Sequence, residues 1–284
     1  MKTIFITGAN GFIGKNLSEQ LGNKYKLLTP RRKELNLLNT KDVVTYFKRN
    51  KIDVVINCAA VGGSRIEEHV SSALSDNLRI FFNLLKNKDK YKKIIHLGSG
   101  AEYDKSKPIV KIKEIDFGKT IPQDEYGFFK YICSTYIEKE KNIVCLRIFG
   151  LFGKYEDFRY RFISNAITNN LKGLPITLNQ NVFFDYMYID DFIKIVDYFI
   201  NHNVKQKFYN IGTGNKIDIL TIAKKINKIS DKQSKVMLKN KGLNSEYTCD
   251  NRRLINELKQ FKFTSFDQSL EELYKWYKTI WKKS

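Results

Sequence analysis

Tyr126 and Lys130 are the two side chains of this chain whose types and spacing best suit proton transfer. Residues at positions i and i+4 lie on one face of a helix, and a lysine ammonium beside a phenol favours the phenolate form. Such a tyrosine can give or take a proton near neutral pH. Taken alone, the pair would fit an ordinary helix surface at least as well, so its meaning depends on what the fold places beside it.

Ser99 adds a hydroxyl at a position where chemistry is expected. It follows the apolar run 93–98, which is typical of a buried parallel strand. Open α/β sheets place their reacting groups at the carboxyl ends of such strands. The serine could therefore bond a carbonyl oxygen on which charge develops.

A third feature is the glycine pattern at the start of the chain. The apolar residues 4–6 are followed by Gly8, Gly11 and Gly14 in the spacing G-x-x-G-x-x-G, and then by a helical pattern. The first glycine permits a tight turn, the second leaves room for a phosphate and the third lets the helix pack closely. The N–H groups at the helix start would face the anion, so we expect a nucleotide pyrophosphate here.

The elements that must position these residues alternate along the first half of the chain. We expect strands near 2–6, 25–29, 53–57, 93–98 and 143–148, and helices near 12–21, 41–50, 66–88 and 125–139. This alternation predicts an α/β fold of the Rossmann type, a doubly wound parallel sheet with right-handed crossovers. Beyond about residue 150 the pattern is mixed. We expect helices near 160–172, 190–201, 217–229, 251–258 and 267–281, and strands near 175–178 and 207–211.

The composition favours an ordinary globular protein. The chain has 284 residues, 42% of them hydrophobic, which is enough for a sizeable core. Its four cysteines show no metal or C-x-x-C spacing, so we expect buried free thiols, no metal and a cytoplasmic protein without a signal peptide. No apolar run has the length of a membrane span. The net charge of +20 is spread along the chain, which argues against nucleic-acid binding.

The chain resembles the extended short-chain dehydrogenase/reductase family of nucleotide-sugar epimerases, dehydratases and reductases. The resemblance rests on the order of three features, which are the glycine motif, Ser99 and Tyr-x-x-x-Lys. The resemblance covers nearly the whole chain. Segments 32–38, 59–63, 97–99 and 209–214 are most similar to the GDP-fucose synthase branch. The family implies catalysis by Ser99, Tyr126 and Lys130, and a nucleotide-sugar substrate.

The resemblance also implies an organisation. It predicts a dinucleotide-binding domain at 1–155, with returning segments near 185–215, and a smaller mixed α/β substrate domain at 156–284. It further predicts a homodimer formed through the helices near 66–88 and 125–139.

The second strand predicts which cofactor is bound. An acid at its tip would bond the ribose hydroxyl of NAD, whereas an arginine accommodates the 2′-phosphate of NADP. Here the strand ends in Pro30, Arg31, Arg32 and Lys33, and Glu34 is expected to belong to the next turn. We therefore favour NADP(H) over NAD(H). The residues expected to bind it are Gly8, Asn10, Gly11, Phe12, Ile13, Gly14, Arg31, Arg32, Asn36, Leu37, Ala59, Ala60, Val61, Asn77 and Lys130.

The same catalytic group serves C4 ketoreductases and redox-neutral C4 epimerases, so it leaves both reactions open. By resemblance, a 4,6-dehydratase carries an Asp-Glu pair directly after the serine, where this chain has Gly100 and Ala101. The GDP-fucose synthase branch epimerises C3 and C5 with a cysteine and a histidine, whose positions here hold Ala101 and Arg161. Neither is a suitable acid–base group. We therefore expect reduction at C4 of a 4-keto-(6-deoxy) sugar, without epimerisation at C3 or C5.

Two further expectations concern residues outside this group. Many family members carry an arginine that contacts the nucleotide, and Phe184 stands in its place; Arg159, Arg161 and Arg253 are candidates to replace it. His96 is expected to be a hydrogen-bonded core residue. The residues expected to bind substrate are Ser99, Gly100, Ala101, Tyr126, Phe149, Arg161, Phe184 and Arg253. The alternative from a different class is a non-catalytic Rossmann module that binds nucleic acid or a partner protein.

Overall fold

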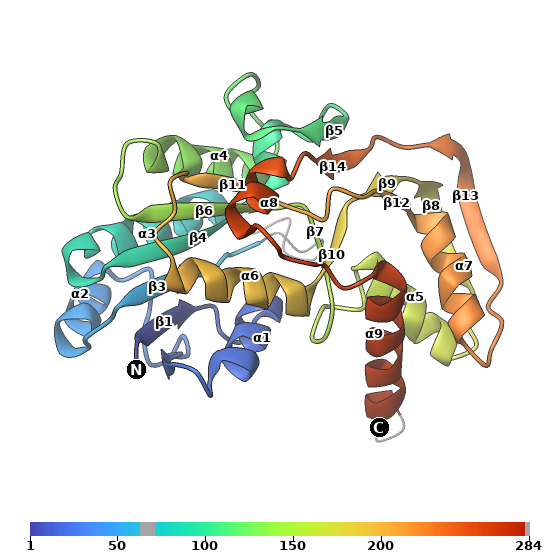
Figure 1. The fold of residues 1–284 in the computed structure, drawn as a ribbon, viewed down its shortest axis with the longest axis horizontal. Coiled ribbons are helices and arrows are strands. Elements are labelled where there is room, and N and C mark those ends of the chain that lie inside the picture. Colours follow the sequence, from blue (N-terminus) through green and yellow to red (C-terminus); the bar gives the residue numbers. More distant parts are fainter. Residues whose placement is uncertain (63–71, 282–284) are drawn as a thin grey trace. The chain divides into compact units, whose positions relative to one another are not determined.

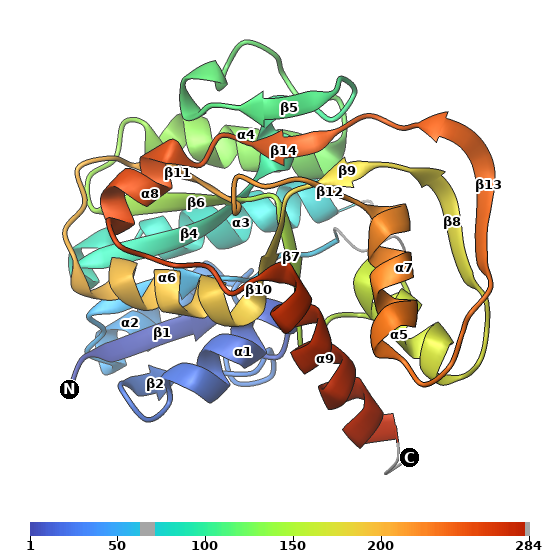
Figure 2. The same ribbon diagram turned by 45° about the vertical axis from the view of Figure 1, so that its right-hand side comes forward.

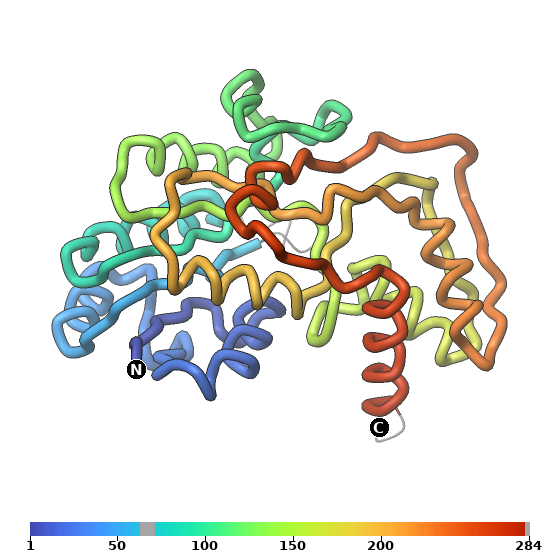
Figure 3. Tube along the Cα trace, in the orientation of Figure 1, coloured from blue at the N-terminus to red at the C-terminus, as the bar shows by residue number. Residues whose placement is uncertain are grey.

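The computed structural model of the chain describes residues 1–62 and 72–281. The chain folds into two compact units, each built from segments that are distant in the sequence (Figures 1 and 3). The first comprises Met1–Ser106, Glu114–Ile148 and Ile193–Asn210. The second comprises Lys107–Lys113, Phe149–Phe192 and Ile211–Ser284.

The first unit contains a six-stranded sheet in the order β11-β6-β4-β3-β1-β2. The neighbours from β2 to β6 pair in parallel, which confirms the predicted α/β fold with a doubly wound parallel sheet. The strands are β1 (Thr3–Thr7), β2 (Lys26–Leu28), β3 (Val54–Asn57), β4 (Lys93–Ser99), β6 (Ile143–Ile148) and β11 (Phe208–Ile211).

Helices cover both faces of this sheet, which explains why its central strands are continuous apolar runs. One core joins the sheet to α2, α3 and α4 through buried side chains such as Phe47, Phe81 and Phe129. Helices α1 and α6 lie on the opposite face (Figures 1 and 2). The helices are α1 (Phe12–Leu21), α2 (Thr40–Arg49), α3 (Ala73–Leu85), α4 (Glu125–Ile137) and α6 (Ile189–Asn201), with single 3₁₀ turns η1 (Lys88–Lys90), η2 (Gly100–Tyr103) and η3 (Glu114–Asp116).

The register of the sheet aligns polar residues at its carboxyl edge. Thr7 of β1 lies opposite Asn57 of β3, and Asn57 lies opposite His96 of β4. Their side chains form hydrogen bonds across the strands, from Thr7 Oγ1 to Asn57 Oδ1 at 2.8 Å and between Asn57 Nδ2 and His96 Nδ1 at 3.2 Å. The sheet thus brings polar groups together at the edge where the glycine turn and Ser99 also lie.

The second unit is mixed α/β. Its sheets are β12-β9-β14-β5, β10-β7 and β13-β8, and α5 and α7 pack on one another and on β8 (Figure 2). The strands are β5 (Ile109–Ile112), β7 (Gly150–Phe152), β8 (Ile176–Asn181), β9 (Phe183–Phe184), β10 (Tyr186–Tyr188), β12 (Ile217–Asp218), β13 (Val236–Leu243) and β14 (Tyr247–Cys249). The helices are α5 (Phe162–Leu171), α7 (Ile219–Ile229), α8 (Arg252–Leu258) and α9 (Phe266–Trp281).

Some elements differ from the sequence prediction. The helix expected near 66–88 is α3, which begins at Ala73, and residues 66–71 lie outside the described part of the chain. Strands β5, β7, β9, β10, β12, β13 and β14 were not predicted at all. Among the helices that the structure describes, none is long and apolar enough to cross a membrane.

Candidate active site and cofactor pocket

The glycine turn after β1 has the geometry that its sequence predicts. Gly8 has φ +64°, and a Cβ there would lie 2.9 Å from the backbone of Ala59. At Gly14 a Cβ would lie 2.3 Å from the Gly8 carbonyl oxygen, so α1 can approach β1 closely only with glycine. The N-cap of α1 is Gly11, which has no side chain to bond the first N–H groups of the helix. Those groups are therefore available to an anion.

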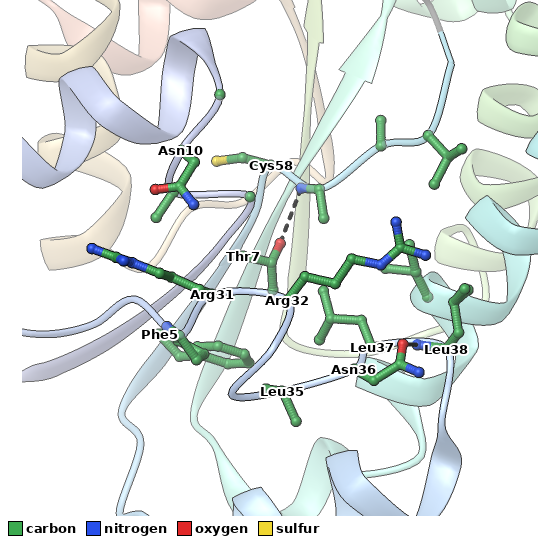
Figure 4. Close-up of a pocket in the computed structure, with 18 residues that line it drawn as sticks. Phe5, Thr7, Asn10, Arg31, Arg32, Leu35, Asn36, Leu37, Leu38 and Cys58 are labelled. Atoms are coloured by element: carbon green, nitrogen blue, oxygen red, sulfur yellow. Dashed lines mark hydrogen bonds between the residues drawn. The ribbon is translucent and has the colours of Figure 1, made fainter. Parts of the chain in front are cut away.

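A pocket of about 330 Å³ opens beside this turn (Figure 4). It brings together ten of the residues expected to bind the cofactor, from the glycine turn, the loop after β2 and the loop after β3. These are Gly8, Asn10, Gly11, Arg31, Arg32, Asn36, Leu37, Ala59, Ala60 and Val61. The sequence did not predict the remaining lining residues, which are Phe5, Thr7, Ala9, Pro30, Leu35, Leu38, Cys58 and Ile80.

The other expected cofactor residues lie outside the lining of this pocket. Phe12, Ile13 and Gly14 belong to α1. Asn77 on α3 holds the loop after β3 in place. Its amide accepts a hydrogen bond from Val61 N at 2.8 Å and donates one to Val61 O at 2.6 Å. Thr7 holds the same loop, because its Oγ1 accepts the N–H of Ala59 at 3.0 Å.

Among the lining residues of the pocket that the structure describes, only two arginines carry a charge. Arg31 and Arg32 both line it, and their side chains extend in opposite directions from the loop (Figure 4). Glu34 is turned to the backbone, where its Oε2 accepts the N–H of Arg31 at 2.8 Å. No aspartate or glutamate is among the lining residues that the structure describes. The pocket is therefore chemically suited to an anionic group near the loop after β2.

Cys58 corrects one expectation, and His96 meets another only in part. Cys58 is not simply buried, since it lines the pocket, although burial raises the pKa of its thiol to about 12 against the opposing effect of Lys130. His96 is only half satisfied: Asn57 donates to Nδ1, which leaves the proton of the neutral ring on Nε2, and this atom has no partner among the described residues. Burial, helped by the charge of Lys130, lowers the pKa of His96 well below its usual value, so the ring stays neutral.

Around Ser99 the structure assembles the segments that carry the expected catalytic residues. Ser99 ends β4 and is mostly buried, and its Oγ accepts the N–H of Ala101 at 3.1 Å. Lys130 of α4 is also buried, and its Nζ donates to the carbonyl oxygen of Leu97 at 2.5 Å. The same Nζ lies 5.8 Å from the centroid of the Tyr126 ring. The lysine is thereby placed between the end of β4 and the tyrosine.

Gly127 explains how α4 comes so close to the turn after Ser99. A Cβ at Gly127 would lie 2.7 Å from the carbonyl oxygen of Ala101, so any side chain would push the helix away. Asp124 caps the same end of α4 and accepts the N–H of Gly127 at 2.9 Å. The local sequence Asp124–Gly127 therefore fixes where α4 begins, and with it the position of Tyr126 in the first turn of the helix.

A second cation near Tyr126 was not predicted. Lys105 Nζ lies 5.9 Å from the centroid of the Tyr126 ring and 3.2 Å from Asp124 Oδ1. The lysine is not part of any motif, so only the tertiary structure reveals it. Glu102, the acid nearest to Ser99 in sequence, is fully buried and forms an ion pair with Arg147.

Two of the other residues expected to bind substrate, Gly100 and Ala101, begin η2 in the first unit, and the rest lie in the second unit. Phe149 and Phe184 both contact Tyr247, with ring centroids 5.1 Å and 6.1 Å away. Arg161 is the N-cap residue of α5, and Arg253 lies in α8. The structure therefore brings the two phenylalanines into one aromatic cluster, whereas the two arginines belong to different helices.

Glu156 is a further residue that the sequence did not single out. It is buried in the second unit, where its Oε2 accepts the hydroxyl of Ser164 at 2.6 Å. Burial raises the pKa of this carboxyl to about 7, although Ser164 and Arg161 oppose the shift. The described residues contain no group of three or more His, Cys, Asp or Glu side chains that could hold a metal ion.

Comparison with known proteins identifies the chain's relatives. The model of the NAD dependent epimerase/dehydratase family matches residues 4–212. GDP-L-colitose synthase from Yersinia pseudotuberculosis is 25% identical over 252 residues, which cover 80% of this chain and 81% of that protein.

Solved structures share the fold across nearly the whole chain. GDP-mannoheptose C4 reductase from Campylobacter jejuni with NADP bound has a TM-score of 0.83 at 19% identity, covering 98% of both chains. dTDP-glucose 4,6-dehydratase from Bacillus anthracis in complex with NAD has a TM-score of 0.83 at 18% identity, covering 98% of this chain and 97% of that one. Because a reductase with NADP and a dehydratase with NAD are equally similar, the fold alone does not determine the reaction or the cofactor.

Proposed function

The chain belongs to the NAD-dependent epimerase/dehydratase family, and we propose that it is an NADPH-dependent C4 ketoreductase of a nucleotide-linked 4-keto-6-deoxy sugar. Family membership makes it an NAD(P)-dependent oxidoreductase of the extended short-chain dehydrogenase/reductase type. The observation that supports reduction most is the assembly of Ser99, Tyr126 and Lys130 around the end of β4.

Each residue of the group has a role that its contacts allow. The nicotinamide, when bound, supplies the hydride that reaches C4. Tyr126 donates a proton to the C4 oxygen as the general acid. Ser99 Oγ already accepts the N–H of Ala101, so its own proton is free to bond the same oxygen as negative charge develops there. Lys130 uses one of its three N–H donors on Leu97, and the others can hold the ribose and the tyrosine.

The cofactor proposal follows from the loop after β2. A 2′-phosphate carries charge that a ribose hydroxyl lacks, and an arginine of this pocket would bond it. Glu34, the nearest acid, is engaged by the backbone of Arg31 and does not take the position of an NAD-selective carboxylate. We therefore propose NADPH as the cofactor, with Arg32 as its selecting residue.

The absence of epimerisation is proposed from two side chains. Moving a proton at C3 or C5 needs a base and an acid on opposite sides of the ring. Ala101 offers only a methyl group, and an arginine such as Arg161 stays protonated at any working pH. Glu102 cannot replace them, because it is buried against Arg147.

The test is a panel of 4-keto-6-deoxy nucleotide sugars linked to GDP, CDP, dTDP and UDP, followed by NADPH absorbance. We expect stoichiometric NADPH consumption with one or more members and a single product diastereomer. Inversion at C4 of the corresponding nucleotide sugars that carry a C4 hydroxyl, without net NADPH consumption, would instead establish a redox-neutral C4 epimerase. Failure of the whole panel, together with salt-sensitive binding of DNA or RNA, would favour the non-catalytic module.

We also propose a homodimer through α3 and α4. Phe82 and Tyr136 remain 39% and 38% exposed on these helices, and their rings meet edge-on with centroids 5.1 Å apart. Phe128, Ile132 and Tyr136 recur every four residues on α4, so they share one face. An apolar face of this kind is typical of a contact between proteins. The part of the expected interface at 66–71 lies outside the described residues.

For the dimer, light scattering after gel filtration should give about twice the chain mass of 33.3 kDa. The Phe82→Glu/Tyr136→Glu variant should elute as a monomer, because two carboxylates would be buried without partners. Ile115→Glu, at a residue that is 71% exposed, is the matched control and should leave the mass unchanged. A monomeric wild type, or a double variant that stays dimeric, would contradict the proposed interface.

A further inference from the structure

We propose that Glu102 is a positioning residue that fixes the hydroxyl of Ser99; this inference rests on the catalytic role of Ser99 in the proposed function. Glu102 follows Ser99 by three residues, in η2. Its Oε1 accepts the backbone N–H of Ser99 at 2.9 Å, while Ser99 Oγ accepts the N–H of Ala101 at 3.1 Å. These two bonds close the turn from both ends, so the orientation of the serine depends on the glutamate.

The second oxygen of Glu102 ties this turn to two other elements. Oε2 accepts the hydroxyl of Ser134 at 2.6 Å and the Nε–H of Arg147 at 2.7 Å. Ser134 lies four residues after Lys130 on α4, and therefore on the same helix face. One carboxylate thus connects the turn after β4, the helix that carries Tyr126 and Lys130, and strand β6. A shift of Glu102 would move Ser99 relative to the other two catalytic residues.

Arg147 pairs with this carboxylate in the interior of the first unit. Both side chains are almost completely buried, at 1% and 0% exposure. The guanidinium carbon lies 4.2 Å and 4.3 Å from the ring centroids of Phe117 and Phe208, and Nη1 donates to the hydroxyl of Tyr103 at 3.1 Å. These contacts hold the guanidinium in an orientation in which its Nε–H faces Glu102 Oε2. The other carboxylate oxygen, Oε1, is thereby directed toward the backbone of Ser99.

Gly98 gives independent support. A Cβ at this position would lie 2.5 Å from Glu102 Oε1 and 2.6 Å from Cys145 Sγ. The residue before Ser99 therefore leaves the space through which the carboxylate reaches the serine backbone. With both oxygens bonded and no exposed surface, Glu102 has no access to a substrate proton, so it acts through Ser99 and not as an acid catalyst.

A double-mutant cycle with Ser99→Ala separates positioning from a general structural role. Glu102→Gln keeps the volume but has one acceptor oxygen in place of two, so it cannot accept from both Ser99 N–H and Arg147, and the turn should shift. We expect this variant to lower kcat for the 4-keto sugar about tenfold, since small displacements of a catalytic group are costly. In the Ser99→Ala background the same substitution should lower kcat less than about twofold, because the hydroxyl that it positions is gone. Equal factors in the two backgrounds would overturn the proposal.

Two further variants separate the loss of positioning from a loss of folding. Glu102→Leu/Arg147→Met removes both buried charges together and so avoids a lone ion that could prevent folding. It should fold and lose kcat as Glu102→Gln does, and wild-type kcat in this folded variant would overturn the proposal. Asp197→Asn, which alters a carboxylate bonded to Tyr25, is the control and should leave kcat unchanged in both backgrounds.

The cycle also distinguishes this inference from the proposed function. Wild-type kcat in Ser99→Ala would show that the serine is not catalytic and would overturn its proposed role and the positioning role of Glu102, whereas absence of reduction by the wild type would overturn the proposed function. A large loss in Ser99→Ala with wild-type kcat in Glu102→Gln would overturn only the positioning role. Affinity for NADPH should be the same in all variants, because Glu102 does not line the cofactor pocket.

Discussion

Replacing Tyr126 with phenylalanine should lower kcat by about 10²–10⁴-fold, the usual contribution of general-acid catalysis. The variant removes only the phenol oxygen, so the helix α4 and its contacts with the turn after Ser99 should persist. Hydride transfer to C4 would then generate an alkoxide without the phenol that is proposed to protonate it. Ser99 and Lys130 are proposed to orient and stabilise the reacting groups and not to supply this proton, so a large loss is expected.

The measurement is the steady-state rate of NADPH oxidation, together with the Kd of NADPH by calorimetry. We expect the Kd to stay within about twofold, since no contact to the phenol oxygen is proposed for the cofactor pocket. Tyr131→Phe, on the same helix with its ring 4.9 Å from Phe117, is the matched control and should retain wild-type kcat. Near-normal turnover in Tyr126→Phe would exclude this residue as the proton donor.

Replacing Arg32 with alanine should weaken NADPH binding about 100-fold, equivalent to about 2.7 kcal/mol, and NADH binding hardly at all. Only NADPH carries the 2′-phosphate, and a charge-assisted, bidentate contact to it would be lost. The neighbouring Arg31 also lines the pocket, but its side chain extends away from that of Arg32 (Figure 4). It should therefore compensate only in part.

Calorimetric titration with both cofactors measures this selectivity directly. Lys33→Ala is the matched control, because Lys33 is an exposed cation next in sequence that does not line the pocket. It should bind both cofactors as the wild type does. An equal loss of NADPH and NADH affinity in Arg32→Ala would show that the arginine does not read the phosphate.

The fold of the first unit could be predicted from the sequence because its strands are buried on both faces. Residues 93–99, for example, are buried from Ile94 onward, and Ile94, Ile95 and Leu97 make the strand recognisable as an apolar segment. The strands of the second unit give no such signal. β13 is eight residues long, but seven of them are exposed, and β9 and β12 have only two residues each. Such strands depend on partners distant in sequence and have no period of their own.

The residues of the candidate site also divide into those that the sequence reveals and those that only the structure reveals. The glycine turn, Ser99, Tyr126 and Lys130 are recognisable because each belongs to a short motif with fixed spacing. Glu102 and Arg147 are 45 positions apart, and only the pairing of β4 with β6 brings them together. Lys105 approaches Tyr126 through a turn that no local pattern specifies. Sequence reasoning therefore found the residues proposed to react but not the residues that hold them.

The central claim is that the protein reduces C4 and leaves C3 and C5 untouched. It is tested most directly by running the NADPH-dependent reaction in D₂O with the accepted 4-keto sugar and examining the product by NMR. The account predicts one diastereomer, stoichiometric NADPH oxidation and no enzyme-dependent deuterium at C3 or C5, because Ala101 and Arg161 cannot exchange those protons. A reaction without enzyme corrects for spontaneous exchange beside the ketone. Enzyme-dependent deuterium at C3 or C5 would contradict the account and would reveal an acid–base pair.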